Sequence, residues 1–303
     1  MELPSPLERA PGGLYDGLDL WLKREDVHEL GAFKWRGALP TIAAYKERGA
    51  SAVVTASTGN HGAAVAWASR QLGLRAMVYA PAGASLAKLA LIDGLGAEVR
   101  LAGTDLDFAK DEGKRFAAET QIPFFEDGVE PTQYEGYGAI AEEIADQIPE
   151  PPSAVVVPVG NGALIGGIGK ALNRRSPGTL VIGVAANEAP VMARSWEAGQ
   201  PVECDRMATF ADGLAVRVAI PEAVALLDRV VDRMVTVSER EMAYAVGAFA
   251  RSGIRVEGAA ASALAALPRL SDIEGPVIAI VTGKNIDDEL YRRAVDQPES
   301  FPE

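Results

Sequence analysis

Residues 154–164 read Ala-Val-Val-Val-Pro-Val-Gly-Asn-Gly-Ala-Leu, an apolar run that passes directly into a glycine-containing loop. A short run of Val and Ala without polar alternation is typical of a parallel strand that is buried on both faces. The stretch therefore predicts a strand over 154–157 that ends in a tight turn. Similar apolar runs predict further strands over 52–55, 75–79, 98–101, 180–185, 233–237 and 277–281.

Stretches with helical periodicity lie between these runs, at 63–72, 85–95 and 139–147. Ser238 and Glu241 have the spacing of a capping box, which predicts the start of another helix. Strands that alternate with helices in this way predict an α/β fold with parallel sheets. The polar segment 127–137 and the prolines within 149–152 predict a division of the chain, so that the pattern alone favours two sequential halves.

The composition excludes several classes of protein. Of the 303 residues, 48% are hydrophobic, and the formal net charge is −13, which argues against nucleic acid as a partner. The sequence shows neither a signal peptide nor an apolar run near the ~20 residues that a membrane span needs. It has one cysteine, Cys204, and two histidines, His28 and His61, too few for a His-rich zinc site. We therefore expect a cytoplasmic protein that binds neither nucleic acid nor membranes.

Ligands of open α/β sheets bind at the carboxyl ends of strands, so the loops there are candidate sites. The loop after 52–55 contains Ser57, Thr58, Gly59, Asn60 and His61. Its hydroxyls, its amide and the N–H groups of the following helix could bind a carboxylate or a phosphate. Ser, Thr and Asn are also ordinary helix caps, and a single His at a helix start is more often structural.

The loop quoted first has two interpretations. Its residues Gly160, Asn161, Gly162, Ala163 and Leu164 allow a close backbone approach to an anion, so they could bind one phosphate group. Alternatively, Gly160, Gly162 and Gly166 form a variant of the dinucleotide fingerprint, with Glu188 as the ribose-binding acid of an oxidoreductase.

Two further residues are chemical candidates. Thr282 places a hydroxyl at the carboxyl end of the strand over 277–281. Lys34 lies between Phe33 and Trp35, in a run that is mostly small and apolar. A lysine in an apolar setting can serve as a nucleophile toward carbonyl groups, although it can equally form a structural ion pair.

The order of these segments resembles the fold type II family of pyridoxal-phosphate (PLP) enzymes, the tryptophan synthase β-like group, and within it the serine/threonine dehydratase-like branch. Each motif is modest, but eight occur in the family's order between about residues 5 and 290. The matching segments are Ser5-Pro6-Leu7, Lys23-Arg24-Glu25-Asp26, Ala32-Phe33-Lys34-Trp35-Arg36-Gly37-Ala38, Ser57-Thr58-Gly59-Asn60-His61, Gly160-Asn161-Gly162-Ala163-Leu164, Ala211-Asp212-Gly213, Val256-Glu257-Gly258-Ala259-Ala260-Ala261 and Thr282-Gly283-Lys284-Asn285.

The resemblance implies two three-layer α/β/α domains with mostly parallel sheets, and PLP in the cleft between them. The small, substrate-carboxylate domain (38–135) is inserted into the large, PLP-binding domain (1–37 and 136–303). It also implies an ammonia-lyase or dehydratase that acts on a β-hydroxy amino acid. Members of the family are commonly homodimers, so the resemblance implies a possible homodimer here. The end of the chain at 303 predicts no C-terminal regulatory domain.

The resemblance also assigns roles to residues. Lys34 binds PLP covalently and then acts as the base, Phe33 packs near the ring, and Asn60 hydrogen-bonds the phenolic oxygen. The segment Ser57, Thr58, Gly59, Asn60 and His61 binds the substrate carboxylate. The phosphate is held by Gly160, Asn161, Gly162, Ala163 and Leu164, and Thr282 lies against the pyridine nitrogen.

Departures from the family pattern keep alternatives open. Ala32 replaces the usual Ser, and Tyr137 departs from the family's Gly-Gln-Gly-Thr segment. Thr58 stands where dehydratases have Ala, and its hydroxyl could reach the substrate carboxylate or the α-carbon. Thr58 is therefore a second catalytic candidate, and racemase or β/γ-replacement chemistry of the threonine synthase or cysteine synthase kind stays possible. Ala185 replaces the carboxylate metal ligand of serine racemase-like members, so no metal site is expected.

Overall fold

The computed structural model describes residues 3–204 and 207–303. The chain forms two compact units, and one continuous segment makes up the smaller one. Unit 1 contains the chain up to Ala32 together with Tyr137–Glu303, and unit 2 contains Phe33–Gly136. Residues 33–37 and 136, which the resemblance assigns to the large domain, thus lie in unit 2. The assignment of cofactor and carboxylate binding to particular domains stays a prediction.

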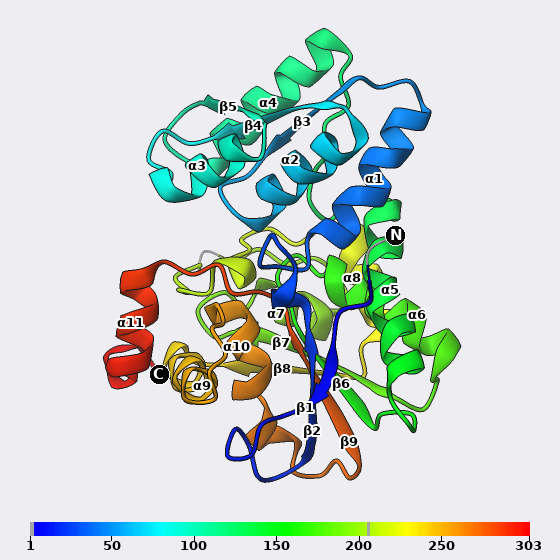
Figure 1. The fold of residues 1–303 in the computed structure, drawn as a ribbon, viewed down its shortest axis with the longest axis vertical. Helices are drawn as coiled ribbons and strands as arrows, with labels where there is room; N and C mark the ends of the chain where they lie inside the picture. Colours follow the sequence, from blue (N-terminus) through cyan, green and yellow to red (C-terminus); the bar gives the residue numbers. More distant parts are fainter. Residues whose placement is uncertain (1–2, 205–206) are drawn as a thin grey trace. The chain divides into compact units, whose positions relative to one another are not determined.

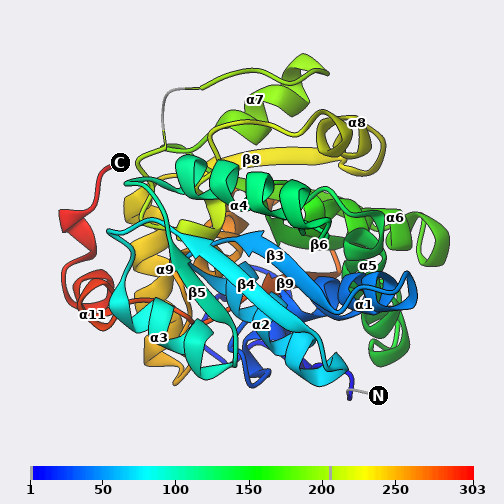
Figure 2. The same cartoon turned by 90° about the horizontal axis from the view of Figure 1, so that it is seen from above.

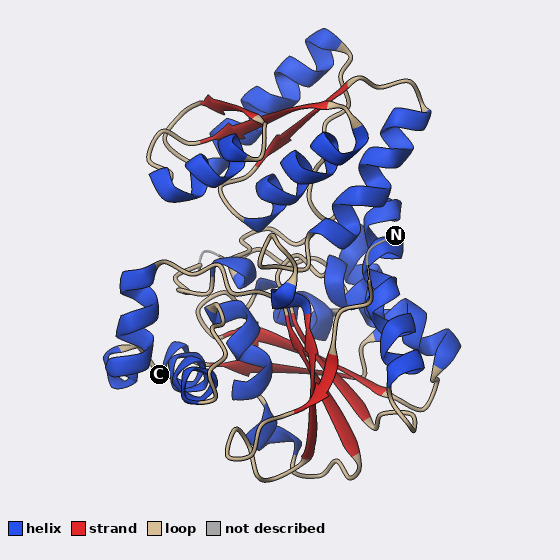
Figure 3. Cartoon of the chain, viewed as in Figure 1, coloured by secondary structure: helices blue, strands red, loops and turns tan. Residues whose placement is uncertain are grey.

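Unit 1 is built on a six-stranded sheet with the order β1-β2-β9-β6-β7-β8 (Figures 1 and 3). All neighbouring strands are parallel except β1 and β2, which pair antiparallel. The strands are β1 (Leu7–Arg9), β2 (Asp19–Arg24), β6 (Ala154–Pro158), β7 (Leu180–Ala186), β8 (Arg233–Val237) and β9 (Pro276–Val281). The predicted α/β class with mostly parallel sheets is confirmed.

Helices cover both faces of this sheet. In Figure 1, α9 and α10 lie on one side of the central strands and α6 lies on the other. Every residue of β6 and β9 is buried, as expected for Val- and Ile-rich strands between two helical layers. The helices of unit 1 are α6 (Ala163–Arg175), α7 (Val191–Ala198), α8 (Pro221–Val230), α9 (Glu239–Arg251), α10 (Gly258–Ala265) and α11 (Asp288–Asp296), and the short 3₁₀ helices are η1 (Glu25–Val27), η2 (Asp212–Leu214), η3 (Leu267–Leu270) and η4 (Pro298–Ser300).

Unit 2 contains a three-stranded parallel sheet, β3-β4-β5, whose strands lie side by side in Figure 2. The segment before Phe125 extends this sheet beyond β3, because Phe124 forms a parallel bridge with Val54. In Figure 1, α4 covers one face of this sheet and α2 covers the other. The elements are β3 (Ala52–Ala56), β4 (Arg75–Ala80), β5 (Glu98–Leu101), α1 (Trp35–Glu47), α2 (Asn60–Leu72), α3 (Leu86–Gly94) and α4 (Leu106–Thr120).

The helix α5 (Pro131–Gln147) begins in unit 2 and continues in unit 1. It starts eight residues before the predicted 139–147 helix, because Pro131 can occupy the first helical position without loss of a hydrogen bond. The predicted capping box is confirmed at α9, where Ser238 Oγ accepts from the Glu241 N–H and the Glu241 carboxylate accepts from the Ser238 N–H. Within the described residues, no helix is both long and apolar enough to cross a membrane.

Candidate functional site

Lys34 immediately precedes α1, and its side chain is 16% exposed. Its Nζ lies 5.1 Å from the centre of the Phe33 ring, which is the apolar neighbour that the sequence predicted. The first turn of α1 approaches α5 closely, since a Cβ at Gly136 would lie 1.9 Å from the Arg36 carbonyl oxygen. That carbonyl receives no helical bond from residue 40, because Pro40 has no N–H. Gly136 therefore lets the start of α5 pack against the helix start that carries Lys34.

The sequence did not identify Asp127 as a partner of Lys34. Lys34 Nζ donates to Asp127 Oδ2 at 2.7 Å, across 93 positions of the chain. Asp127 follows the strand-like segment beside β3, so it lies at the same sheet edge as the loop that follows β3. The available signal was its position in a polar, turn-rich segment, and nothing local connected it to Lys34.

The predicted carboxylate-binding loop leaves β3 and enters α2. Ser57 is buried, and its Oγ accepts from the Gly59 N–H at 3.1 Å, which tightens the turn before the helix. Gly62 lets the first turn of α2 pack closely, because a Cβ there would lie 3.2 Å from Ser57 Cβ. The amino-terminal N–H groups of α2 therefore lie directly after the strand end, where an anion is favoured.

The His61 ring faces the interior of unit 2. Thr55 Oγ1 donates to the Phe125 carbonyl at 2.7 Å and therefore accepts from His61 Nε2 at 3.0 Å. His61 Nδ1 lies 3.6 Å from Asp127 Oδ1. Burial lowers the pKa of the imidazole, and the Lys34 charge acts in the same direction, against the opposing effect of Asp127. The ring thus supports the loop, and the backbone N–H is the part of His61 that suits a ligand.

In unit 1, the glycine loop ends at the start of α6. Gly162 is the N-cap residue with φ 88°, a left-handed conformation that favours glycine. Gly160 allows close packing with the Ala-Asp-Gly segment, since a Cβ at Gly160 would lie 2.2 Å from the Gly213 carbonyl oxygen. Asn161 Oδ1 accepts from the Ala163 N–H at 3.1 Å. The loop and helix start, Gly160 to Leu164, have the form of a phosphate cradle.

Thr282 follows β9, the strand that pairs with β6. Because parallel neighbours end at the same edge, Thr282 and the glycine loop lie at one end of the sheet. The Thr282 hydroxyl is buried, and the part of the chain that the structure describes offers it no hydrogen-bond partner. A buried hydroxyl needs a partner, and the pyridine nitrogen of PLP is a suitable acceptor. The hydroxyl and the phosphate cradle therefore fit PLP.

The chain just before Phe33 is paired with the segment after Thr282. Ala32 bridges to Gly283, and the Lys284 N–H donates to the Gly31 carbonyl at 2.9 Å. Asn285 Nδ2 also donates to the Leu30 carbonyl at 2.7 Å. The last motif of the family pattern thus supports the backbone that leads to Lys34.

The first two motifs of the pattern have a structural role within unit 1. Lys23 is fully buried, and its Nζ donates to the Ser5 carbonyl at 2.7 Å and to the Glu143 carboxylate at 2.6 Å. Glu25 accepts from Ser5 Oγ at 2.5 Å. These bonds connect the N-terminal segment and β2 with α5.

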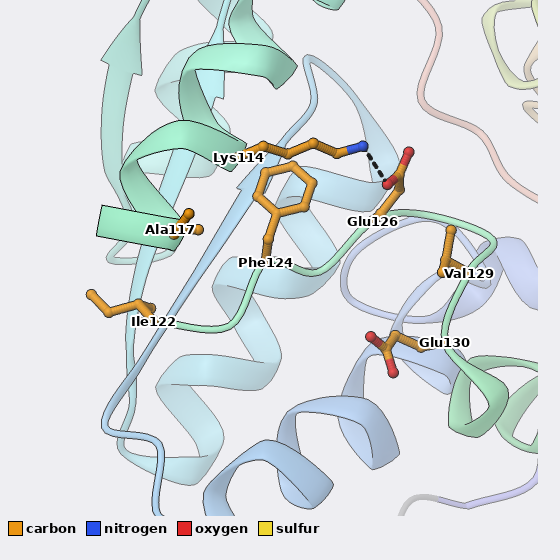
Figure 4. A pocket seen from close by; sticks show the side chains of 8 residues that line it. Lys114, Ala117, Ile122, Phe124, Glu126, Val129 and Glu130 are labelled. Atoms are coloured by element: carbon orange, nitrogen blue, oxygen red, sulfur yellow. Dashed lines mark ion pairs between the residues drawn. The ribbon is translucent and has the colours of Figure 1, made fainter. Parts of the chain in front are cut away.

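A pocket of about 380 Å³ in unit 2 is separate from these predicted residues. In Figure 4, Lys114 extends across the Phe124 ring to the Glu126 carboxylate, at 2.7 Å. The pocket is lined by Lys114, Ala117, Ala118, Ile122, Phe124, Glu126, Val129 and Glu130. Lys34 and the Ser57–His61 loop are not among these lining residues. The adjacent carboxylates thus form ion pairs with different lysines: Glu126 pairs with Lys114, and Asp127 pairs with Lys34.

The predicted residues therefore form two groups. In unit 2, Asp127 joins Lys34 to the loop that contains Ser57, Thr58, Gly59, Asn60 and His61. In unit 1, Thr282 and the Gly160–Leu164 segment share one edge of the sheet. The group in unit 2 offers an amine for a carbonyl group and a helix start for an anion, and the group in unit 1 offers a helix start for an anion and a hydroxyl for a ring nitrogen.

Comparisons with known proteins identify the family of the chain. Residues 1–283 match the family model described as pyridoxal-phosphate dependent enzyme. The chain is 35% identical to an L-threonine ammonia-lyase of Thermotoga maritima over 296 residues, which cover 97% of this chain and 72% of that protein.

Two solved structures are also similar. The processed form of threonine deaminase isoform 2 from Solanum lycopersicum has a TM-score of 0.92 at 30% identity and is matched over 98% of this chain and 88% of that one. A pyridoxal 5'-phosphate-dependent aspartate racemase has a TM-score of 0.86 at 25% identity, over 95% and 92%. These matches argue against the alternative that the glycine loop binds a dinucleotide in an oxidoreductase. The chain belongs to the family of PLP-dependent enzymes, in its serine/threonine dehydratase-like branch.

Proposed function

We propose that this enzyme is an ammonia-lyase that converts L-threonine or L-serine to the corresponding 2-oxo acid and ammonia. The similarity to L-threonine ammonia-lyase over nearly the whole chain supports the reaction class. The observation that carries the proposal is the buried Thr282 hydroxyl, placed at the same sheet edge as the phosphate cradle. A neutral hydroxyl leaves a ring nitrogen unprotonated, which favours elimination over transamination.

Different residues would hold the cofactor and transfer the proton. The N–H groups at the start of α6, from Gly162 to Leu164, would hold the cofactor phosphate, and Thr282 would donate to the ring nitrogen. When bound, PLP supplies an electron sink for the negative charge that develops at the substrate α-carbon. Lys34 Nζ takes the α-proton as general base, and the β-hydroxyl then leaves.

The loop between β3 and α2 would orient the substrate. We assign the substrate carboxylate to the hydroxyls of Ser57 and Thr58 and to the N–H groups from Gly59 to His61, because a helix start favours an anion. We keep the roles that the resemblance implies for two further residues: Asn60 would hydrogen-bond the phenolic oxygen of the cofactor, and Phe33 would pack near its ring. A cytoplasmic location and a homodimer also stay predictions from the sequence.

A substrate panel tests the proposal. Purified enzyme with PLP is given L-threonine, L-serine, their D-isomers, and O-acetylserine together with a thiol, and 2-oxo acid, inverted amino acid and thioether product are measured. We expect 2-oxo acid from L-threonine or L-serine. Inversion without 2-oxo acid would show a racemase, for which the Thr58 hydroxyl is the candidate residue, and thioether product alone would show a replacement enzyme.

Variants of Thr282 test the observation that carries the proposal. Thr282→Val removes the hydroxyl at nearly the same volume, and we expect 2-oxo acid formation to fall about tenfold, as for loss of one hydrogen bond. The matched control is Thr282→Ser, which keeps the hydroxyl and should retain most of the rate. Equal rates in the two variants would contradict the assignment of Thr282 to the cofactor.

A further inference from the structure

Asp127 lies beside the reactive amine, and neither the resemblance nor the proposed function gives it a role. Asp127 Oδ2 accepts from Lys34 Nζ at 2.7 Å, and the Asp127 side chain is 28% exposed. The carboxylate is therefore close enough for a direct, charge-assisted hydrogen bond with the amine.

The other oxygen of this carboxylate is held in place. Gln133 Nε2 donates to Asp127 Oδ1 at 2.6 Å, and Gln133 Oε1 accepts from the Gly128 N–H at 2.7 Å. Gln133 is fully buried, and Tyr134 Oη donates to the Gly128 carbonyl at 2.7 Å. The amide of Gln133 therefore connects the carboxylate to the backbone of its own loop, and the first turn of α5 fixes both groups.

The charges around Asp127 keep it ionised. Burial alone would raise the pKa of its carboxyl, but the charge of Lys34, with a contribution from His61, holds that pKa below the usual range. The neighbouring Glu126 does not compete for Lys34, because it pairs with Lys110 and Lys114. Asp127 is thus a fixed anion that faces the amine.

We propose that Asp127 is the counter-ion of Lys34, which orients the amine and stabilises its ammonium form after the amine takes the α-proton. This inference rests on the proposed function. In that step the substrate Cα–H bond breaks, an N–H bond forms at Lys34 Nζ, and the electron pair stays with the substrate. The positive charge develops at Nζ, beside the ionised carboxylate, so the interaction is stronger after the transfer than before it.

The first experiment measures the amine directly, in the full-length protein after removal of the cofactor. Acetic anhydride attacks only unprotonated amines, and mass spectrometry gives the labelling rate of Lys34 relative to Lys46, an exposed lysine at the other end of α1. Asp127→Asn should raise this ratio about tenfold at pH 8, because the amine loses the charge-assisted hydrogen bond that occupies its nitrogen. Asp127→Ser removes the same charge and replaces Asp127→Asn if that variant does not fold.

Glu126→Gln is the matched control, since it removes the adjacent carboxylate that pairs with other lysines. It should leave the Lys34 ratio within about twofold of the wild type. A ratio in Asp127→Asn or Asp127→Ser that also stays within twofold overturns the proposal, whatever the effect of these variants on activity.

The second experiment uses the holoenzyme with the best substrate and its α-deuterated form. Asp127→Asn should lower kcat about 10- to 100-fold with KM little changed, and should raise the deuterium isotope effect, because α-proton transfer becomes slower. Asp127→Glu should recover part of the rate. A lower kcat without a larger isotope effect would place the role of Asp127 elsewhere. If the labelling ratio changes while the wild-type enzyme forms no 2-oxo acid, the proposed function fails and the counter-ion assignment stands.

Discussion

Lys23 and Lys34 both lie next to carboxylates, and their surroundings differ. Lys23 is 0% exposed, and its three N–H donors meet the Ser5 carbonyl, the Glu143 carboxylate and the Gln147 amide oxygen. Lys34 is 16% exposed and lies at a helix start, beside a carboxylate that is itself 28% exposed.

The difference shows that burial of a lysine does not by itself indicate chemistry. Lys23 sits within β2, where the strand and α5 surround its charge, so a ligand has no access to the amine. Lys34 lies where a strand-edge loop and a helix start meet, and its side chain stays partly exposed. The first lysine holds the fold together, and the second suits a reaction.

The largest effect is expected from Lys34→Ala. This variant should lose covalent PLP and at least about a thousandfold of the activity, because the amine acts both as attachment point and as base. Reduction of the wild-type enzyme with borohydride, followed by peptide mass spectrometry, should place the cofactor on Lys34. Lys46→Ala, on the same helix, should keep both properties. Cofactor found on Lys23 would show that Lys23, and not Lys34, is the reactive lysine.

Lys23→Ala should act on stability instead. Removal of one partner leaves the Glu143 carboxylate with an uncompensated charge, which costs about 3–5 kcal/mol of unfolding free energy. Urea unfolding measures this loss, and the fraction that stays folded should keep its kcat. The double variant Lys23→Met/Glu143→Gln removes both charges and should lose less. A stable Lys23→Ala protein without activity would show that Lys23 has a chemical role.

The sheets could be predicted because their strands are local patterns. β6 and β9 are almost continuous Val, Ile and Ala, and all seven predicted strands occur in the structure. β2 was missed because charged residues interrupt its apolar pattern, and its buried Lys23 is acceptable only with Glu143 from a distant helix.

The candidate site was predictable to a smaller degree. The Ser57–His61 loop and Thr282 are predicted as strand-end motifs and Lys34 as an amine in an apolar setting, all in the order of the family's segments. Asp127 is not predicted, because its importance depends on a contact with Lys34 across 93 positions. Pairs of this kind, like the contact between Gly160 and Gly213, are set by tertiary packing and leave no local pattern.

The smallest effect is a pH dependence of stability that belongs to the surroundings of Lys34 alone. His61 is buried among Thr55, Phe125 and Asp127, whereas the acceptors of Lys23 are a carbonyl, a carboxylate and an amide. Burial lowers the pKa of His61 from its ordinary value of 6.5. Below pH 6.5 the unfolded chain therefore binds a proton at this residue that the folded chain does not.

Stability should then fall as the pH decreases from 6.5, by at most about 1.4 kcal/mol per pH unit from this group. Urea unfolding at pH 7.5, 6.5 and 5.5 measures the slope, and His61→Gln should reduce it by this amount because glutamine does not titrate. Lys23→Met/Glu143→Gln, with His61 intact, should keep the slope. An unchanged slope in His61→Gln would mean that the imidazole takes up its proton in the folded protein, next to the ionised Asp127, and that the interior around Lys34 is more polar than its packing indicates.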